Sequence, residues 1–365
     1  MAPVCRRQVF VRDPVATLLT DAETDPLLMQ PRSRRKTIAI GLVGAGPIWE
    51  RRYRHAVRSL ADRLDIRAVY DAVLGRAQTL AAELDAEAVH GMRQLFERTD
   101  LKGILVLDPA WYDLFPAELA CRYHKPAFLA GALGNDLAAL ETLHQSAVAH
   151  GTLLMTEFSL RHTPATSRLQ ELMATHLGRA QRIAIEAILP EPNASPAALP
   201  GQATRTELLV GLLDWCTYVT GRTPISIRSR ATANECAVDV GFRPDASGRA
   251  VSGASIRLRS AITANDSGEV SHTARHEVQC ERGAAVIDRQ DLIAWRNGTG
   301  ECRESLSAER SDAERMLDQF CRRLHGGLVP VADVHDAWRA ISLARAAEFS
   351  LETGQVATGP WSVGG

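Results

Sequence analysis

The hydrophobic pattern of this chain changes character near residue 160. Between residues 37 and 160, short continuous apolar runs alternate with segments in which apolar residues recur at helical spacing. Continuous runs are typical of strands buried on both faces, and strands that alternate with helices form parallel sheets with right-handed crossovers. We expect a doubly wound, Rossmann-type α/β domain over residues 37–160. Its predicted strands are residues 38–43, 66–70, 103–107, 126–129 and 153–155.

Residues 161–365 show a different pattern, in which alternating runs are separated by turn residues. Such runs are typical of antiparallel strands, so a second, α+β domain with a predominantly antiparallel sheet is expected. Residues 190–200 are rich in Pro and Ala and predict a surface loop. The predicted strands are residues 182–188, 225–231, 251–260, 272–281 and 284–295, and the predicted helices are residues 165–177, 204–220, 308–324 and 331–352.

Composition limits the classes of partner. The chain has 365 residues and a formal net charge of -1, so no strong field draws it toward nucleic acid or an acidic membrane. Its seven cysteines are scattered and form no Cys-x-x-Cys pair, which argues against a zinc site and a disulfide framework. No apolar run is long enough to predict a membrane span. We expect a cytoplasmic protein whose residues 1–36 form a mobile leader.

A glycine-rich loop follows the first predicted strand. Gly44 is placed for the tight turn, and Gly46 would let the backbone approach a pyrophosphate at the start of the next helix. With Pro47 and Ile48, these residues predict a dinucleotide site, although both glycines also fit a plain turn. Trp49 stands where a third glycine is usual, so it must push the helix outward or lie along the groove.

Asp71 ends the second predicted strand. A carboxylate at this place accepts hydrogen bonds from ribose hydroxyls and repels a 2′-phosphate, which favours NAD over NADP. Arg76 is close enough in sequence to weaken that preference. The alternative is that Asp71 is a solvated turn or capping residue.

These features together resemble the glucose-fructose oxidoreductase, inositol dehydrogenase and MocA family (Gfo/Idh/MocA) from residue 37 to about residue 355. The resemblance rests on residues 44–48, 68–71, 107–109, 151–161, 164, 329–330 and 333–350. It implies an ancestral sugar or polyol dehydrogenase with NAD or NADP as cofactor and a small, sugar-like ligand. The cofactor-binding residues that it implies are Gly44, Gly46, Pro47, Ile48, Asp71, Asp108 and Pro109.

The family's catalytic positions are altered in this chain. Where the family has a Glu-Lys-Pro triplet after the fifth strand, residues 130–132 are Ala-Gly-Ala, with Gly131 in place of the lysine. The family's acid/base histidine lies three residues before an aspartate; aligning that aspartate with Asp214 places Gly211 at the histidine. Another common histidine becomes Asp113. The resemblance therefore implies that ordinary catalysis is lost or rebuilt.

No other lysine is placed to compensate. The chain has only Lys36, Lys102 and Lys125. Ligands of such sheets bind beyond the carboxyl ends of the strands, whereas Lys102 and Lys125 precede the fourth and fifth strands and Lys36 lies in the leader.

Glu157, Arg161 and His162 are the candidates for a rebuilt site. Arg161 could hold an anionic substrate, and Glu157 or His162 could move a proton. The alternatives are that Glu157 pairs with Arg161, and that His162 is a capping or surface residue before the next helix. Trp111 and Tyr112 either stack on a sugar or pack over the sheet edge.

Two functional hypotheses remain open. The first is an NAD(P)-binding oxidoreductase homologue whose catalysis is lost or rebuilt. The second is a non-catalytic ligand sensor or assembly subunit that keeps only the fold. We also expect a homo-oligomer formed through the second-domain sheet, because an open sheet needs cover on both faces. Apolar strand residues that offer such cover are Ile256, Leu258, Val278, Val286 and Ile287.

Overall fold

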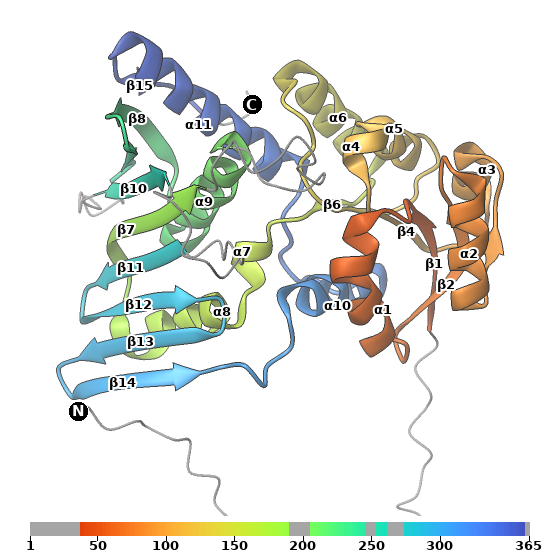
Figure 1. The fold of residues 1–365 in the computed structure, drawn as a ribbon, viewed down its shortest axis with the longest axis horizontal. Coiled ribbons are helices and arrows are strands. Elements are labelled where there is room, and N and C mark those ends of the chain that lie inside the picture. Colours follow the sequence, from red (N-terminus) through yellow and green to blue (C-terminus); the bar gives the residue numbers. More distant parts are fainter. Residues whose placement is uncertain (1–36, 190–204, 245–252, 261–273, 362–365) are drawn as a thin grey trace, which may run out of the picture.

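The computed structural model describes residues 37–189, 205–244, 253–260 and 274–361, so the expected leader and the expected loop at residues 190–200 lie outside them. The first domain holds a six-stranded parallel sheet in the order β3-β2-β1-β4-β5-β6 (Figure 1). The strands are β1 (Ile38–Val43), β2 (Leu64–Tyr70), β3 (Glu87–Ala88), β4 (Gly103–Val106), β5 (Ala127–Leu129) and β6 (Leu154–Thr156). The order reverses direction at β1, beside β4, which is where doubly wound sheets bind ligands.

Helices cover both faces of this sheet. The first face is covered by the π-helical turn η2 (Trp49–Tyr53), α1 (Arg54–Ser59), α2 (Leu74–Leu84) and α10 (Asp312–Leu324). The second face is covered by α3 (Met92–Glu97), α5 (Phe115–Arg122) and α6 (Leu137–His150), with the short helix α4 (Pro109–Tyr112) at the sheet edge. Apolar residues on both faces of the strands therefore enter two separate cores.

Helix α10 comes late in the sequence but packs on the first sheet. The ring of Phe320 lies 6.1 Å from that of Phe128 in β5. The helix begins at Asp312 rather than near residue 308 because Ser311 and Glu314 form a capping box. The division of the chain at residue 160 stays a prediction, while this helix and the parallel sheet share one core.

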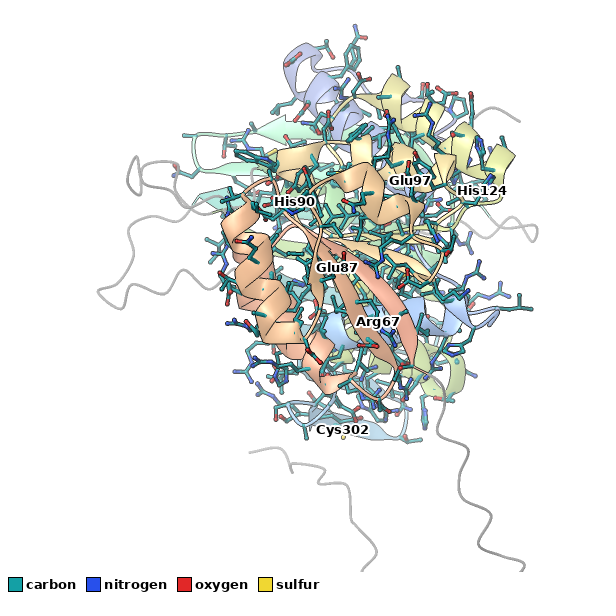
Figure 2. The ribbon with its side chains drawn as sticks, turned by 90° about the vertical axis from the view of Figure 1, so that its right-hand side faces the viewer. Arg67, Glu87, His90, Glu97, His124 and Cys302 are labelled. Carbon is teal, nitrogen blue, oxygen red and sulfur yellow. The ribbon has the colours of Figure 1, made fainter. Side chains whose placement is uncertain are left out.

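One edge of the first sheet carries charged side chains. Figure 2 shows Glu87 of the edge strand β3 and Arg67 of the neighbouring strand β2. Strand β3 has only two residues, and a short, charged edge discourages pairing with another chain.

None of the helices in the described part of the chain is long and apolar enough to cross a membrane.

The second domain holds a nine-stranded sheet in the order β14-β13-β12-β11-β7-β10-β9-β8-β15. It is antiparallel except between β7 and β10, so the predicted fold class is confirmed. The strands are β7 (Ala180–Leu189), β8 (Pro224–Ala231), β9 (Glu235–Phe242), β10 (Gly253–Ser260), β11 (Ala274–Cys280), β12 (Gly283–Arg289), β13 (Leu292–Asn297), β14 (Gly300–Ser305) and β15 (Ala357–Thr358).

The predicted strand at residues 284–295 was wrong in one respect. It is a hairpin of β12 and β13, because the chain turns at Gln290 and Asp291. Residues 288–291 are four consecutive polar residues between two apolar runs, a turn signal that the prediction did not use. Strands β9, β14 and β15 were not predicted.

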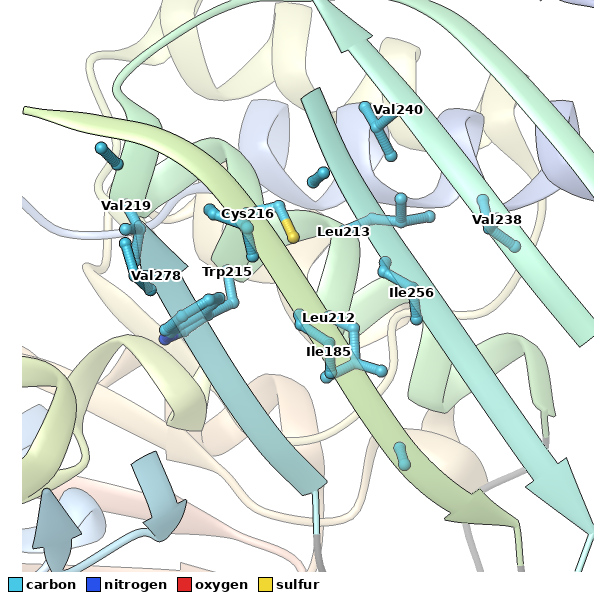
Figure 3. Packing of buried hydrophobic residues seen from close by; sticks show 14 of the residues in the cluster. Ile185, Leu212, Leu213, Trp215, Cys216, Val219, Val238, Val240, Ile256 and Val278 are labelled. Carbon is cyan, nitrogen blue, oxygen red and sulfur yellow. The ribbon is translucent and has the colours of Figure 1, made fainter. Parts of the chain in front are cut away.

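Helices cover one face of the second sheet: α7 (Ser159–His162), α8 (Pro164–Leu172), the π-helical turn η3 (Met173–Leu177), α9 (Arg205–Thr220) and α11 (Val334–Thr353). In Figure 3, Leu212, Leu213 and Trp215 of α9 face apolar strand residues such as Ile185 and Val278. These contacts form the core of the domain.

The opposite face of this sheet is charged. Arg257 and Arg259 lie within 4.0 Å and 3.7 Å of Glu186, and Arg230 pairs with Asp239 at 2.6 Å. Most of the apolar residues expected to cover a partner instead belong to the core beneath the helices: Ile256, Leu258, Val278 and Ile287. The homo-oligomer stays a prediction, which light scattering at micromolar concentration tests.

Candidate functional site

The glycine loop turns sharply at the end of β1. Gly44 has φ of +90°, a conformation that favours glycine, and its N–H donates to the Tyr70 carbonyl at 2.9 Å. The next N–H, of Ala45, donates to the Asp71 carboxylate at 2.8 Å. The loop is thus tied to the end of β2 before any ligand binds.

Asp71 is buried rather than solvated. Its second oxygen accepts the N–H of Val73 at 2.7 Å, and the Arg76 guanidinium lies 3.7 Å away. Only 3% of its side chain is exposed. A ribose that hydrogen-bonds to the Asp71 carboxylate must therefore displace a group that now contacts it, such as the Arg76 guanidinium.

Asp108, which follows β4, lies directly against the glycine loop. A Cβ on Gly44 would lie 2.7 Å from the Asp108 Cβ, and a Cβ on Gly46 would lie 2.5 Å from its Oδ2. Asp108 therefore excludes a side chain at Gly44, whereas a side chain at Gly46 would have to displace the Asp108 carboxylate. Burial, together with the nearby charge of Asp71, raises the pKa of Asp108. The carboxylates of Asp71 and Asp108 thus lie beside a loop whose backbone geometry would otherwise suit a bound anion.

Trp49 does not lie along the groove, which was one expectation. It is fully buried in the core beneath the loop, and the helix accommodates it through the π-helical turn η2. Pro47 has no N–H to donate, so a phosphate would depend on the following N–H, that of Ile48.

The end of β5 is where the resemblance places the missing lysine. Gly131 has φ of +82°, and its N–H donates to Glu157 Oε2 at 2.8 Å. The other oxygen of Glu157 lies 3.0 Å from Arg52 Nη2, which in turn lies 2.6 Å from Asp312. The suggested pairing of Glu157 with Arg161 is wrong, because Arg52 of η2 reaches this carboxylate first.

Arg161 is committed to two carboxylates. Its Nε donates to Asp214 at 2.7 Å, its Nη2 donates to the other oxygen of Asp214, and Nη1 lies 3.2 Å from Asp336. The rings of Phe158 and Tyr218 flank the guanidinium. This arrangement joins α7, α9 and α11 and leaves little of Arg161 for an anionic substrate.

His162 is neither a cap nor a surface residue, which corrects the expectation. Thr163 caps α8 by accepting the N–H of Thr166, while His162 is buried. Burial, and then the charges of Arg161 and Arg315, lower the pKa of His162 to about 4. The imidazole is therefore neutral at physiological pH.

The remaining candidates lie at opposite ends of the strands of the first sheet. Lys125 Nζ donates to the carbonyls of Arg98 and Leu101, on the edge away from the loop. The Tyr112 hydroxyl accepts the N–H of Ala72 at 2.8 Å, so this ring packs over the sheet edge while Trp111 is exposed. Among the described side chains, no cluster of His, Cys, Asp and Glu is arranged to hold a metal.

A Cβ at Gly211 would make only an ordinary contact. Outside the helix itself, its nearest heavy atom would be Leu160 Cδ1, at 3.9 Å. A side chain can therefore begin at residue 211 without a clash, whereas the backbone at Gly131 strains residues other than glycine. The two altered positions therefore differ: a side chain is sterically possible at residue 211 but strained at residue 131.

A cavity of about 640 Å³ lies between the domains. It is lined by α8, by β11 and β12, by the segment before α10 and by His55 of α1, and not by the loop at residues 44–48, Gly131 or Gly211. One of its buried polar residues is His276, which the sequence pattern did not single out, because a single histidine in a predicted strand has no distinguishing spacing.

No family model matches the chain, and no curated protein matches its sequence. Solved structures share its fold at low identity. Levoglucosan dehydrogenase in complex with NADH and levoglucosan matches with a TM-score of 0.73 and 12% identity over 89% of this chain and 100% of that one. An Agrobacterium radiobacter oxidoreductase in complex with NAD+, L-tartaric acid and magnesium has a TM-score of 0.72 and 14% identity, covering 88% of this chain and 98% of its own.

A repressor has the same fold. The super-repressor mutant of Gal80p from Saccharomyces cerevisiae matches with a TM-score of 0.71 and 13% identity over 88% of this chain and 98% of that one. Other solved structures with this fold are named as dehydrogenases, among them a myo-inositol dehydrogenase from Sinorhizobium meliloti, so the fold that the motifs imply is confirmed. At these identities, the likeness carries no conclusion about chemistry.

Proposed function

We propose that this protein is a relative of the sugar dehydrogenases that binds a nicotinamide dinucleotide but does not oxidise ordinary polyols or aldoses. The single observation that carries the proposal is the geometry of Gly131. This residue has a left-handed backbone, and its N–H is bound by Glu157 at the end of β5. No lysine side chain reaches the reacting position from there.

Neighbouring groups do not replace the missing ones. Hydride transfer from an alcohol needs a group that takes the hydroxyl proton, and such groups typically contribute about 10²- to 10⁴-fold to the rate. Glu157 is held by Arg52 and Gly131, and Arg161 by Asp214. His162 is buried with a pKa of about 4, which makes it a weak base.

Dinucleotide binding is supported by the turn at Gly44, by its place at the switch point of the sheet and by Asp71 at the end of β2. The Asp71 carboxylate favours NAD over NADP. Asp108 opposes the pyrophosphate charge, so we expect weak affinity. Residues that would hold the dinucleotide are Gly44, Gly46, Pro47, Ile48, Asp71 and Pro109, with Asp108 beside the pyrophosphate.

Two measurements test this proposal. Calorimetry with NAD and NADP should show binding, with NAD preferred. A panel of sugars and polyols with either dinucleotide, followed at the nicotinamide absorbance, should show no turnover. Robust turnover would overturn the inactive assignment and direct attention to Glu157, Arg161 and His162 as a rebuilt site.

A second candidate function is a ligand sensor or assembly subunit without a dinucleotide. The observation in its favour is the pair of carboxylates, Asp71 and Asp108, at the glycine loop. If neither NAD nor NADP binds at millimolar concentration, this second function replaces the first.

A further inference from the structure

Two exposed histidines lie together at the end of the first sheet that is opposite the glycine loop. His124 follows α5 and precedes β5, and His150 is the last residue of α6, before β6. Their ring centroids are 5.4 Å apart. Figure 2 shows His124 at the surface of the first domain. Ligands of such a sheet bind beyond the carboxyl ends of its strands, so these histidines are not part of the dinucleotide site.

The hydrogen bonds of the two rings fix which nitrogen carries the proton. His124 Nδ1 lies 3.2 Å from the His150 carbonyl oxygen, and His150 Nδ1 lies 2.8 Å from that of Ser146. A carbonyl oxygen only accepts, so in each neutral ring the proton stays on Nδ1 and Nε2 keeps a bare lone pair. Metal-binding histidines typically have this arrangement, in which one nitrogen donates to a carbonyl and the other binds the metal.

The distance between the rings suits one metal ion. A zinc–imidazole bond is about 2.0–2.1 Å long, and tetrahedral coordination by two rings therefore places their centroids about 5 Å apart. A pair is smaller than the groups of three or more ligands that the described residues lack, so water must complete the coordination. Imidazole nitrogen favours zinc, nickel and copper ions, whereas magnesium and calcium bind oxygen.

The two helix ends also favour a positive charge. The last carbonyl groups of a helix carry a partial negative charge, and both α5 and α6 end beside this pair. His124 ends α5 with φ of +50°, and the N–H of Lys125 donates to the Ala120 carbonyl at 2.9 Å. Gly151 ends α6 with φ of +60°. These turns hold the backbone of both histidines in place before any ligand binds.

A second pair of histidines has different surroundings and serves as a comparison. The rings of His144 and His335 are also 5.4 Å apart. His335 stacks on Trp338, and burial, followed by the charge of Arg339, lowers its pKa. A positive charge is therefore disfavoured at this second pair.

We propose that His124 and His150 form a binding site for a divalent transition-metal ion of the zinc type, held through the two Nε2 atoms. A bound ion joins the end of α5 to the end of α6, so it stabilises the folded chain. The site does not depend on the dinucleotide, and its test is therefore separate from that of the proposed function.

The experiment is calorimetry of the full chain, without an affinity tag and stripped of metal by EDTA, with ZnCl₂ and MgCl₂ as probes and without NAD. We expect Zn²⁺ to bind and Mg²⁺ not to bind. His124→Asn and His150→Gln should each lower the Zn²⁺ affinity by about tenfold or more. Asparagine suits the left-handed backbone at residue 124. His144→Gln is the matched control and should bind Zn²⁺ like the wild type.

Four results would overturn the site: no Zn²⁺ binding to the wild-type chain at about 1 mM, undiminished binding by either variant, an equal loss in His144→Gln, or Mg²⁺ binding as tight as that of Zn²⁺. If a variant does not fold, the wild-type chain with ¹⁵N-labelled histidines decides. Zn²⁺ must then shift the Nε2 resonances of two histidines, and both shifts must remain in His144→Gln. Fewer shifted resonances, or shifts that this control abolishes, also overturn the proposal.

Discussion

At the scale of single residues, the position of Asp108 decides how the glycine loop treats a ligand. Its backbone and Cβ lie against Gly44 and its carboxylate lies beside Gly46. Asp71, Arg76 and Tyr112 are close enough to act on its charge or be acted on by it. A pyrophosphate at the loop would therefore meet a negative charge that is absent from a plain glycine loop. Protonation of Asp108 removes this repulsion.

We predict that Asp108→Asn tightens NAD binding about tenfold at pH 8, equivalent to about 1.4 kcal/mol. The pKa of Asp108 is raised, so in the wild type the anion forms, and affinity falls, as the pH rises through that pKa. The variant should lose this dependence. Calorimetry from pH 4, close to the ordinary carboxyl pKa of 3.8, up to pH 8 measures both effects, and Asp65→Asn on the far end of β2 is the control.

A wild-type affinity that does not change with pH would contradict this account of Asp108 and leave dinucleotide binding untouched. Absence of binding in both proteins at every pH would instead contradict the proposed function. The two failures are thus distinguishable.

Restoring the two expected catalytic residues should not restore activity. A Cβ at residue 211 makes only an ordinary contact with Leu160, but Gly131→Lys places a side chain on a backbone with φ of +82° and disturbs the bond to Glu157. Strain of this kind costs about 1–3 kcal/mol. Thermal unfolding should show a lower midpoint for Gly131→Lys than for Gly211→His. Polyol oxidation by the double variant would show that the site tolerates the lysine.

At the scale of elements, buried charge joins the helices between the two sheets. Arg161 of α7 is bonded to Asp214 of α9 and lies 3.2 Å from Asp336 of α11. From the sequence, Arg161 was expected to be a candidate for binding an anionic substrate. Its partners were not recognisable because they lie 53 and 175 residues away along the chain.

We predict that Asp214→Ala lowers the free energy of unfolding by about 3–5 kcal/mol, because it leaves the Arg161 guanidinium buried with one fewer carboxylate. Urea denaturation measures the change. Asp239→Ala removes the exposed pair with Arg230 and should cost about 0–1 kcal/mol. Similar losses for the two variants would show that burial does not set the strength of the Arg161 pair.

At the scale of the whole molecule, buried histidines make stability depend on pH. His162 and His276 have pKa values of about 4, below the ordinary value of 6.5. Between these values the unfolded chain binds protons that the folded chain does not, so stability is lost as the pH falls from 6.5 toward 4. Above pH 6.5 neither histidine has an effect.

We expect each of these histidines to remove about 2–3 kcal/mol of stability between pH 7 and pH 4.5. Denaturation of His162→Gln at the two pH values should show a smaller loss than the wild type. His176→Gln, at an exposed position, should behave like the wild type. An equal loss in all three proteins would place the acid sensitivity elsewhere.

Much of the first domain was predictable because its signals are local. A buried parallel strand requires a continuous apolar run, and Gly44 and Gly46 stand directly after such a run. The predicted helix starts at residues 308 and 331 were too early. Ser311 and Asp333 are the N-cap residues, so the helices begin directly after them. The hairpin at Gln290 and Asp291 was missed although four consecutive polar residues, 288–291, separate its two apolar runs.

The sequence by itself determined the two-domain architecture, the glycine loop and the absence of lysine and histidine at residues 131 and 211, since each of these depends on residue type and order along the chain. Only the tertiary structure decided the state of the side chains around them. It paired Glu157 with Arg52, Arg161 with Asp214, and Asp108 with the glycine loop, and it buried His276 in the cavity. Such pairings depend on which distant segments the packing of two sheets brings within a few ångströms, and no local pattern records that.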